Sequence, residues 1–153
     1  MALPKLETPI YELELPSTGE KVKYRPFLVK EQKNLMIAME SEEETQLRDS
    51  LATIISDCTF NKIDPYEIPM FDIEFIFLRI RGKSVGEKIK LNVLCPDDNK
   101  TRVDVKINLE DIDVHMKKEH TNEISVTDKI KIFMKYPGLN DMIDVKVDQE
   151  TEQ

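Results

Sequence analysis

The spacing of the hydrophobic residues changes twice along the chain, and this change is what most limits the possible fold. Apolar and polar residues alternate over 10–25, helical spacing follows over 28–81, and alternation returns from residue 86. Alternation indicates strands with one apolar face, whereas a spacing of three to four residues indicates amphipathic helices. The pattern therefore predicts an α+β fold with an N-terminal β-hairpin, about three helices and a second half rich in antiparallel hairpins.

The first hairpin is predicted to pair residues 10–15 with residues 21–25. Glutamates alternate with apolar residues in the first strand, and lysines do so in the second. The segment between them, Pro16–Glu20, contains Pro, Ser, Thr and Gly, which are typical of turns. The polar faces would set glutamates against lysines, a favourable cross-strand arrangement.

Three helices are predicted between the two strand-rich regions. The first begins at Leu28, with an apolar face formed by Leu28, Leu35, Met36 and Met39. The second is expected to begin at Ser41, because Ser41 and Glu44 have the spacing of a capping box. Its apolar stripe is Leu47, Leu51, Ile54, Ile55 and Cys58, which makes Cys58 a core residue.

The third helix is predicted over Met70–Arg81. Pro69 precedes it, acidic residues occupy its first turn and arginines its last, and these are helix start and stop signals. Its Phe and Ile content would also suit a strand. Gly82 is expected to be the C-cap that ends this helix.

The second half is predicted to contain a hairpin followed by shorter strands. Alternating apolar residues on either side of the Pro96–Lys100 link indicate the hairpin, and further strands are expected at 129–135 and 142–147. Residues 1–147 are expected to form a single α+β domain, with subregions 1–84 and 85–147. Residues 148–153 are expected to be a disordered acidic tail.

The charge of the chain is acidic and unevenly placed. The 153 residues carry a net charge of −8, of which Glu40–Asp49 and Asp141–Gln153 contribute −4 each. This balance gives no basic stripe, so nucleic-acid binding is disfavoured. Either the acidic segments only keep a helix start and a tail in contact with solvent, or they form an electrostatic binding surface for a basic partner.

Cysteine content and hydropathy point to an intracellular protein. The chain has two cysteines, Cys58 and Cys95, and no apolar run approaches the roughly 18 residues of a membrane span. We therefore expect a reducing compartment and no membrane partner.

No pattern in the sequence predicts catalysis or a bound cofactor. The tripeptide Gly82–Ser84 lacks the earlier glycine of a phosphate-binding loop, because position 77 is Phe. Cys95 lacks a second thiolate three residues on, and adding His115 and His120 gives the wrong spacing for a zinc site. Both histidines are expected to be solvated surface residues. We predict that the chain is not an enzyme and has no catalytic residue, cofactor or metal ion.

Several segments carry a family resemblance. They are Tyr24–Lys33, which leads from the hairpin into a helix, Leu78–Glu87, and the dipeptides Cys95-Pro96 and Tyr136-Pro137. In this order they resemble the baseplate hub assembly protein family of T-even-type (T4-like) contractile-tailed bacteriophages, over roughly residues 3–143. Longer family members have a further C-terminal segment.

The resemblance implies a protein of the infected bacterial host's cytoplasm that acts in tail assembly. Such a protein would bind other phage baseplate hub proteins and help the hub to form, as a chaperone-like assembly factor. Two alternatives remain at this point: a structural hub subunit retained in the virion tail baseplate, or an acidic adaptor protein unrelated to phage. Salt sensitivity of its complex would favour the adaptor, because screening weakens exposed charge attraction.

The partner-binding surface is predicted to combine the segments 25–27 and 79–86. Its candidate residues are Arg25, Pro26, Phe27, Arg79, Arg81 and Lys83. Pro26 would set the chain direction, Phe27 would be an aromatic anchor, and the arginines would offer forked donors of the kind enriched at binding hot spots. The alternative is that Phe27 fills the core where the hairpin meets the first helix.

Overall fold

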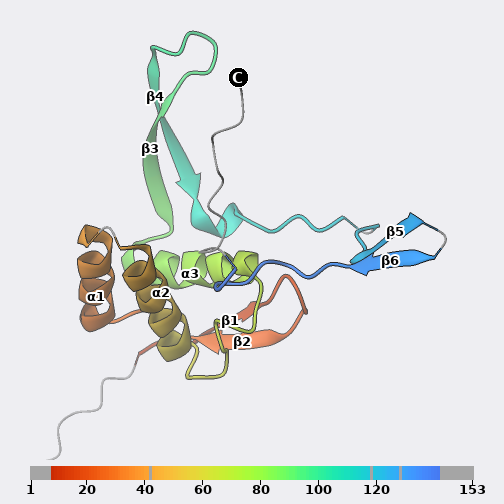
Figure 1. Cartoon of the computed structure of the whole chain (residues 1–153). Coiled ribbons are helices and arrows are strands. Elements are labelled where there is room, and N and C mark those ends of the chain that lie inside the picture. Colours follow the sequence, from red (N-terminus) through yellow and green to blue (C-terminus); the bar gives the residue numbers. More distant parts are fainter. Residues whose placement is uncertain (1–7, 42, 118, 128, 142–153) are drawn as a thin grey trace, which may run out of the picture.

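The fold consists of a helical body and hairpins (Figure 1). The computed structural model describes residues 8–41, 43–117, 119–127 and 129–141. Within those residues the chain forms three α-helices, one 3-10 helix and three separate two-stranded antiparallel sheets. The predicted α+β class, with its N-terminal hairpin, is confirmed.

The N-terminal hairpin pairs β1 (Tyr11–Glu14) with β2 (Lys21–Tyr24). Leu13 lies opposite Val22, and both side chains are buried, so the hairpin turns its apolar face to the body. The opposite face sets glutamates against lysines, as predicted. The turn contains Gly19 at φ 71°, a left-handed conformation that favours glycine.

The core lies between this hairpin and the helices α1 (Val29–Glu40), α2 (Glu44–Cys58) and α3 (Met70–Val85). Its most deeply buried apolar residues come from α2 and α3: Ile54, Ile55, Cys58, Ile73, Ile76 and Ile80. The predicted core position of Cys58 is confirmed. Asp72 in the first turn of α3 is also buried and accepts hydrogen bonds from the N–H and hydroxyl of Ser17, which fastens the hairpin turn to the helix.

The predicted apolar face of the first helix is wrong. Of its four residues only Leu35 packs against the core, whereas Leu28, Met36 and Met39 are exposed. The buried positions of α1 are Glu31 and Ala38. The physical reason is that α1 packs along one side against α2, so the side that carries its methionines faces outward.

The predicted capping box at Ser41 is also wrong. Ser41 follows the last residue of α1, and its hydroxyl donates to the Ala38 carbonyl at 2.8 Å. The helix α2 begins at Glu44, with Glu43 as an N-cap that makes no side-chain capping bond. Because α1 extends to Glu40, the Ser41 hydroxyl is used at the end of α1 instead of the start of α2.

The third helix is confirmed, but its predicted end at Gly82 is wrong. The helix α3 continues to Val85, and Gly86 is the C-cap, with φ 135°. Gly82 lies inside the helix, where a Cβ would stand 3.9 Å from the Leu109 side chain. A Cβ at this position would make only ordinary van der Waals contact, so the helix continues through Gly82 and ends where Gly86 adopts a positive φ.

The second half forms two hairpins. The strands β3 (Lys88–Leu94) and β4 (Arg102–Asn108) pair as predicted and lead into the 3-10 helix η1 (Leu109–Asp111). The other hairpin pairs β5 (Glu123–Thr127), which the sequence did not reveal, with β6 (Ile130–Phe133), inside the predicted strand 129–135. We call these hairpins the β3–β4 ribbon and the β5–β6 ribbon, and both project from the body (Figure 1).

Two predictions concern residues outside the described part of the chain: the strand at 142–147 and the disordered tail at 148–153. The division into one domain over 1–147, with subregions 1–84 and 85–147, stays a prediction.

Candidate protein interface

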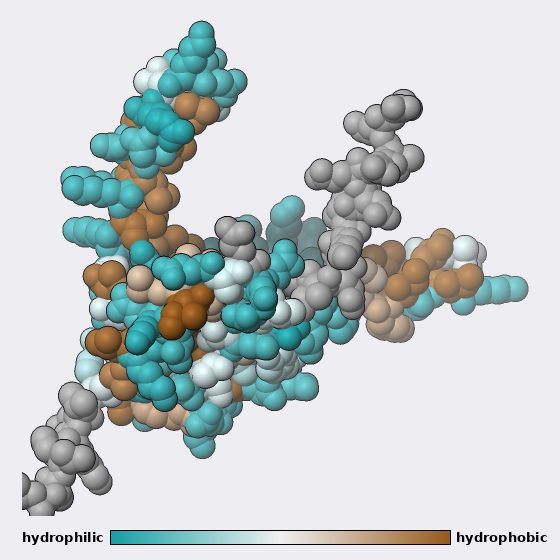
Figure 2. Space-filling model, turned by 60° about the vertical axis from the view of Figure 1, so that its left-hand side comes forward, coloured by the Kyte–Doolittle hydropathy of each residue, from teal (hydrophilic) through white to brown (hydrophobic). Residues whose placement is uncertain are grey.

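The β3–β4 ribbon has one face made only of aliphatic side chains. The register places three apolar pairs directly opposite each other: Ile89 and Ile107, Leu91 and Val105, Val93 and Val103. No other described element covers the outer four of these, which are between 39% and 48% exposed. The apolar residues run along this ribbon in Figure 2, where it rises from the body.

The β5–β6 ribbon repeats this arrangement. Ile124 lies opposite Ile132, alternation places Ile130 on the face of Ile132, and Val126 lies where the register shifts between Ser125 and Thr127. These four side chains are between 46% and 55% exposed. Figure 2 shows a second hydrophobic region, on the ribbon at the right.

A third group of exposed apolar side chains lies on the outward side of α1, which we call the α1 outer face, where helical spacing also places Lys33 and Glu40. It contains Val29, which is 82% exposed, together with Met36, Ile37 and Met39, each more than half exposed. Methionine is flexible and polarizable, and it is common at surfaces that adapt to a partner.

These surfaces are the candidate functional site because they are costly to leave in water. An isolated two-stranded hairpin is marginally stable at best, and stability normally needs packing against another element. Contiguous exposed apolar surface in a folded protein marks interaction sites. The arrangement can therefore bind apolar protein surfaces.

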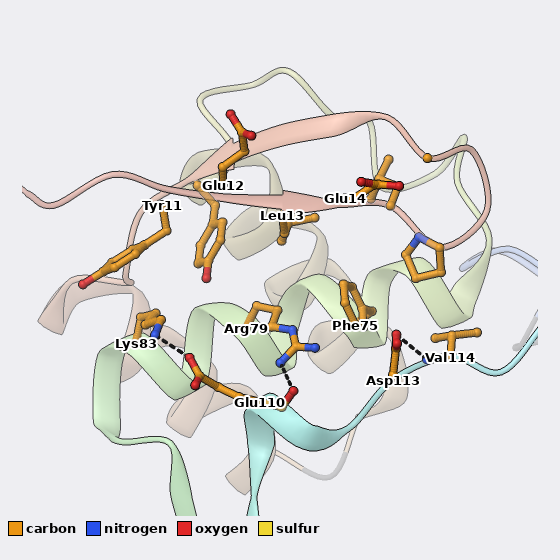
Figure 3. Close-up of a pocket in the computed structure, with 14 residues that line it drawn as sticks. Tyr11, Glu12, Leu13, Glu14, Phe75, Arg79, Lys83, Glu110, Asp113 and Val114 are labelled. Atoms are coloured by element: carbon orange, nitrogen blue, oxygen red, sulfur yellow. Dashed lines mark hydrogen bonds and ion pairs between the residues drawn. The ribbon is translucent and has the colours of Figure 1, made fainter.

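A polar hollow lies between the β1–β2 hairpin and α3 (Figure 3). It has a volume of about 690 Å³, and Tyr11, Tyr24, Arg79, Lys83 and Glu110 are among its lining residues. The Lys83 ammonium lies 2.6 Å from a Glu110 carboxylate oxygen. Hydrogen bonds to Glu110 and Glu87 raise the pKa of Lys83, and the Lys83 hydrogen bond lowers the pKa of Glu110. Within this hollow the charges of Lys83 and Glu110 thus neutralise each other.

The two predicted contact segments meet in space. The Phe27 N–H donates to the Ser84 hydroxyl at 3.0 Å, which places 25–27 beside the end of α3. Phe27 packs against the core cluster, in agreement with the alternative in which it fills the core where the hairpin meets the first helix. Arg25 donates to both carboxylate oxygens of Glu31, at 2.7 and 3.0 Å, and to the Pro26 carbonyl.

The remaining predicted residues, Arg79, Arg81 and Lys83, all lie on α3. Arg79 donates to the carbonyls of Leu109, Glu110 and Ile112, so its guanidinium holds the chain that follows β4. Arg81 and Lys83 are half-buried. The structure thus gives Arg25, Arg79 and Lys83 partners within the chain, and the role of all six residues in partner binding stays a prediction.

The other candidate residues of the sequence do not form a site. His115 and His120 are exposed, as predicted, and the ring of His120 stacks on Tyr136. Cys58 is buried, which raises the pKa of its thiol to about 12. Among the described residues no three His, Cys, Asp or Glu side chains are grouped so that they could hold a metal ion.

The sequence reasoning missed the uncovered faces, although it found the alternation that creates them. Alternation signals an apolar face, but the covering element can belong to the same chain or to another one.

None of the helices in the described part of the chain has the length and apolar character needed to cross a membrane.

The family comparison agrees with the resemblance drawn from the sequence. The model of the family described as T4 bacteriophage base plate protein matches residues 8–153. No curated protein and no solved structure gives a significant match to the chain. Because the family model spans nearly the whole chain, the protein belongs to the T4 bacteriophage base plate protein family.

Proposed function

We propose that the protein takes part in assembly of the phage baseplate hub by binding other baseplate proteins through its uncovered apolar faces. The observation that carries this proposal is the aliphatic face on each of the two ribbons, which no other described element covers. Membership of the baseplate family supplies the class of partner. The role needs no catalytic group, metal or cofactor, so the prediction that the chain is not an enzyme belongs to this proposal.

The energy available from such binding is substantial. Burying the exposed half of an aliphatic side chain contributes about 1 kcal/mol, at about 25 cal/mol per Å² of apolar area. The four outward residues of the β5–β6 ribbon would together contribute a few kcal/mol before the cost of association is subtracted. Several faces engaged at once would give the area of a specific interface.

The assembly role is proposed as chaperone-like. An assembly factor needs a higher affinity for a partner in its assembly-competent state than in other states. A hub subunit retained in the virion could use the same faces, but it would be present at fixed stoichiometry in purified particles. The host cytoplasm is the expected location of an assembly factor, and the tail baseplate that of a retained subunit. The family match leaves the adaptor unrelated to phage without support.

The test is affinity capture of the tagged chain from phage-infected cells, with the bound proteins identified by mass spectrometry. We expect wild-type protein to enrich other baseplate proteins. The variant Ile124→Glu places a charge on the apolar face of the β5–β6 ribbon and should reduce this enrichment at least tenfold, as a loss of about 1.4 kcal/mol would.

The matched control is Ser125→Glu, one residue along on the opposite face of the same strand. It should capture the same proteins as wild type. Capture of host proteins alone by wild type would contradict the proposed function. If Ile124→Glu and Ser125→Glu captured baseplate proteins equally well, the apolar face of the β5–β6 ribbon would not be a contact surface.

A further inference from the structure

The base of the β3–β4 ribbon is fastened to α3 by charged side chains that lie outside the uncovered apolar faces. We propose that Lys83 and Arg79 form a clamp that fixes the direction in which this ribbon leaves the body, and that Lys83 is thereby a positioning residue for partner binding. This inference deepens the proposed function and rests on it for the role of the ribbon. It gives both residues an indirect part in binding, through the ribbon, in place of direct contact with a partner.

The connection from α3 to the ribbon would pivot easily by itself. Only Gly86 and Glu87 separate the end of α3 at Val85 from the start of β3 at Lys88. Gly86 has φ 135°, a conformation that glycine adopts at little cost and that other residues avoid. Small residues of this kind often form hinges. A ribbon attached in this way needs further contacts to keep one direction.

Lys83 supplies such contacts to both ends of the ribbon. Its ammonium lies 2.6 Å from a Glu110 carboxylate oxygen (Figure 3) and is also bonded to a Glu87 carboxylate oxygen. Glu87 directly precedes β3, and Glu110 lies in η1, which directly follows β4. The same ammonium lies 5.3 Å from the centre of the Tyr11 ring in β1. One side chain of α3 thus joins the residue that enters the ribbon, a residue that follows it and the N-terminal hairpin.

Arg79, one turn earlier in α3, holds the backbone on the return side of the ribbon. Its guanidinium donates to the carbonyls of Leu109, Glu110 and Ile112, at 3.1, 2.9 and 2.9 Å. Leu109 is buried, and its N–H donates to the Glu87 carbonyl at 2.7 Å. The two ends of the ribbon are therefore bonded both to each other and to α3.

The charges favour a closed clamp. One ammonium lies between two carboxylates, and hydrogen bonds to Glu110 and Glu87 raise the pKa of Lys83. Because both carboxylates are bonded to the same nitrogen, loss of the Lys83 charge would leave two like charges within about 5 Å of each other. Their repulsion would separate the two ends of the ribbon from α3.

A fixed direction matters because a partner binds only those molecules whose ribbon points the right way. The apparent affinity falls in proportion to the fraction of binding-competent molecules. The clamp acts at the base of the ribbon, so it sets the direction of the ribbon while backbone hydrogen bonds nearer the tip can still open.

The first test measures the direction of the ribbon in the full chain, as the distance between two spin labels by double electron–electron resonance. Cys95 directly follows β3 at the outer end of the ribbon and is partly exposed, whereas Cys58 is buried and stays unlabelled. The second label is introduced by Glu74→Cys, at an exposed position of α3. We expect a narrow distance distribution with Lys83 present. Lys83→Gln should broaden it, and Lys83→Arg, which keeps the charge, should restore it.

Capture from phage-infected cells gives the second readout. Lys83→Gln should lower the enrichment of baseplate proteins about tenfold, as expected if the ribbon points correctly in about a tenth of the molecules. Lys83→Arg should capture as wild type does. The matched control Lys62→Gln removes an exposed lysine of the body and should change neither readout. All three variants should nearly keep the wild-type melting temperature, because ion pairs at the surface contribute little to stability.

The two readouts together decide the proposal. If the distance distribution of Lys83→Gln were as narrow as that of wild type, the proposal would be overturned, and lost capture would then assign Lys83 to direct contact with a partner. A broadened distribution with unchanged capture would overturn the positioning role. A wild type whose narrow distribution depends on Lys83, but which captures no baseplate protein, would contradict the proposed function and leave the clamp confirmed.

Discussion

Arg25 and Glu31 form the ion pair that closes the corner between β2 and α1. Their side chains are only 14% and 9% exposed, and the Leu28 N–H also donates to the Glu31 carboxylate, at 2.6 Å. Removing one partner of a buried pair leaves the other charge uncompensated. We expect Arg25→Met to lower the free energy of unfolding by about 3 kcal/mol, measured by urea denaturation.

The control for this substitution is Lys21→Ala. Lys21 pairs with Glu12 at the surface, where both side chains are at least half exposed. Its loss should change stability by less than about 1 kcal/mol. An unchanged stability of Arg25→Met would show that the Arg25 guanidinium is available to a partner, as the sequence predicts.

The same pair gives a pH dependence. Burial alone would raise the pKa of Glu31, but the hydrogen bonds from Arg25 and Leu28 and the charge of Arg25 outweigh it, so the pKa is lowered. The folded-state pKa then lies below the unfolded value of about 4.3. The stabilisation is fully present above that value and is lost as the pH falls through the folded-state pKa.

We therefore expect the melting temperature of the wild type to fall on acidification below about pH 4.5. Glu31→Gln should be less stable at pH 7, and its melting temperature should depend less on pH in the acidic range. Parallel acid profiles of the two proteins would contradict the assigned role of Glu31.

At the scale of the elements, the sequence predicts hairpins and helices well and their ends poorly. Periodicity indicates the first two helices and start and stop signals indicate the third, and all three exceed ten residues. The capping box at Ser41 misleads because the Ser41 hydroxyl bonds to the Ala38 carbonyl at the end of α1. Gly82 misleads because a second glycine, Gly86, ends the helix four residues later. The strand β5 was missed because Glu123–Thr127 is short and follows a polar segment.

Phe27 lies between β2 and α1 and is bonded to α3, so its substitution tests the packing where these three elements meet. Its side chain packs against the core and its N–H is bonded to Ser84 near the end of α3. We expect Phe27→Ala to cost about 3 kcal/mol of stability. At a temperature where the variant remains folded, it should still capture baseplate proteins.

Val29→Ala is the control for stability, because Val29 is two residues away and mostly exposed. It should change the free energy of unfolding by less than about 0.5 kcal/mol. Lost capture by Phe27→Ala with an unchanged melting temperature would instead assign Phe27 to the predicted contact surface.

At the scale of the whole molecule, the site could be predicted only in part. The alternation at Ile89, Leu91 and Val93 correctly indicates an apolar ribbon face. It does not indicate that this face lies outside the body, because the spatial position of a hairpin depends on packing between distant segments. The partners of Arg79 could not be predicted for the same reason, because its guanidinium meets carbonyls about thirty residues away.

The uncovered ribbons are the feature that ties the fold to membership of the baseplate family, and backbone hydrogen exchange tests their role most directly. The measurement compares amide exchange of the chain alone with that of the chain in its captured baseplate complex. We predict rapid exchange in β3–β4 and β5–β6 of the free chain, because two-stranded ribbons open easily. The complex should slow exchange in both ribbons, while α3 should be protected in both states. Ribbons that exchange equally fast in the complex would contradict the proposal that their apolar faces are the contact surfaces.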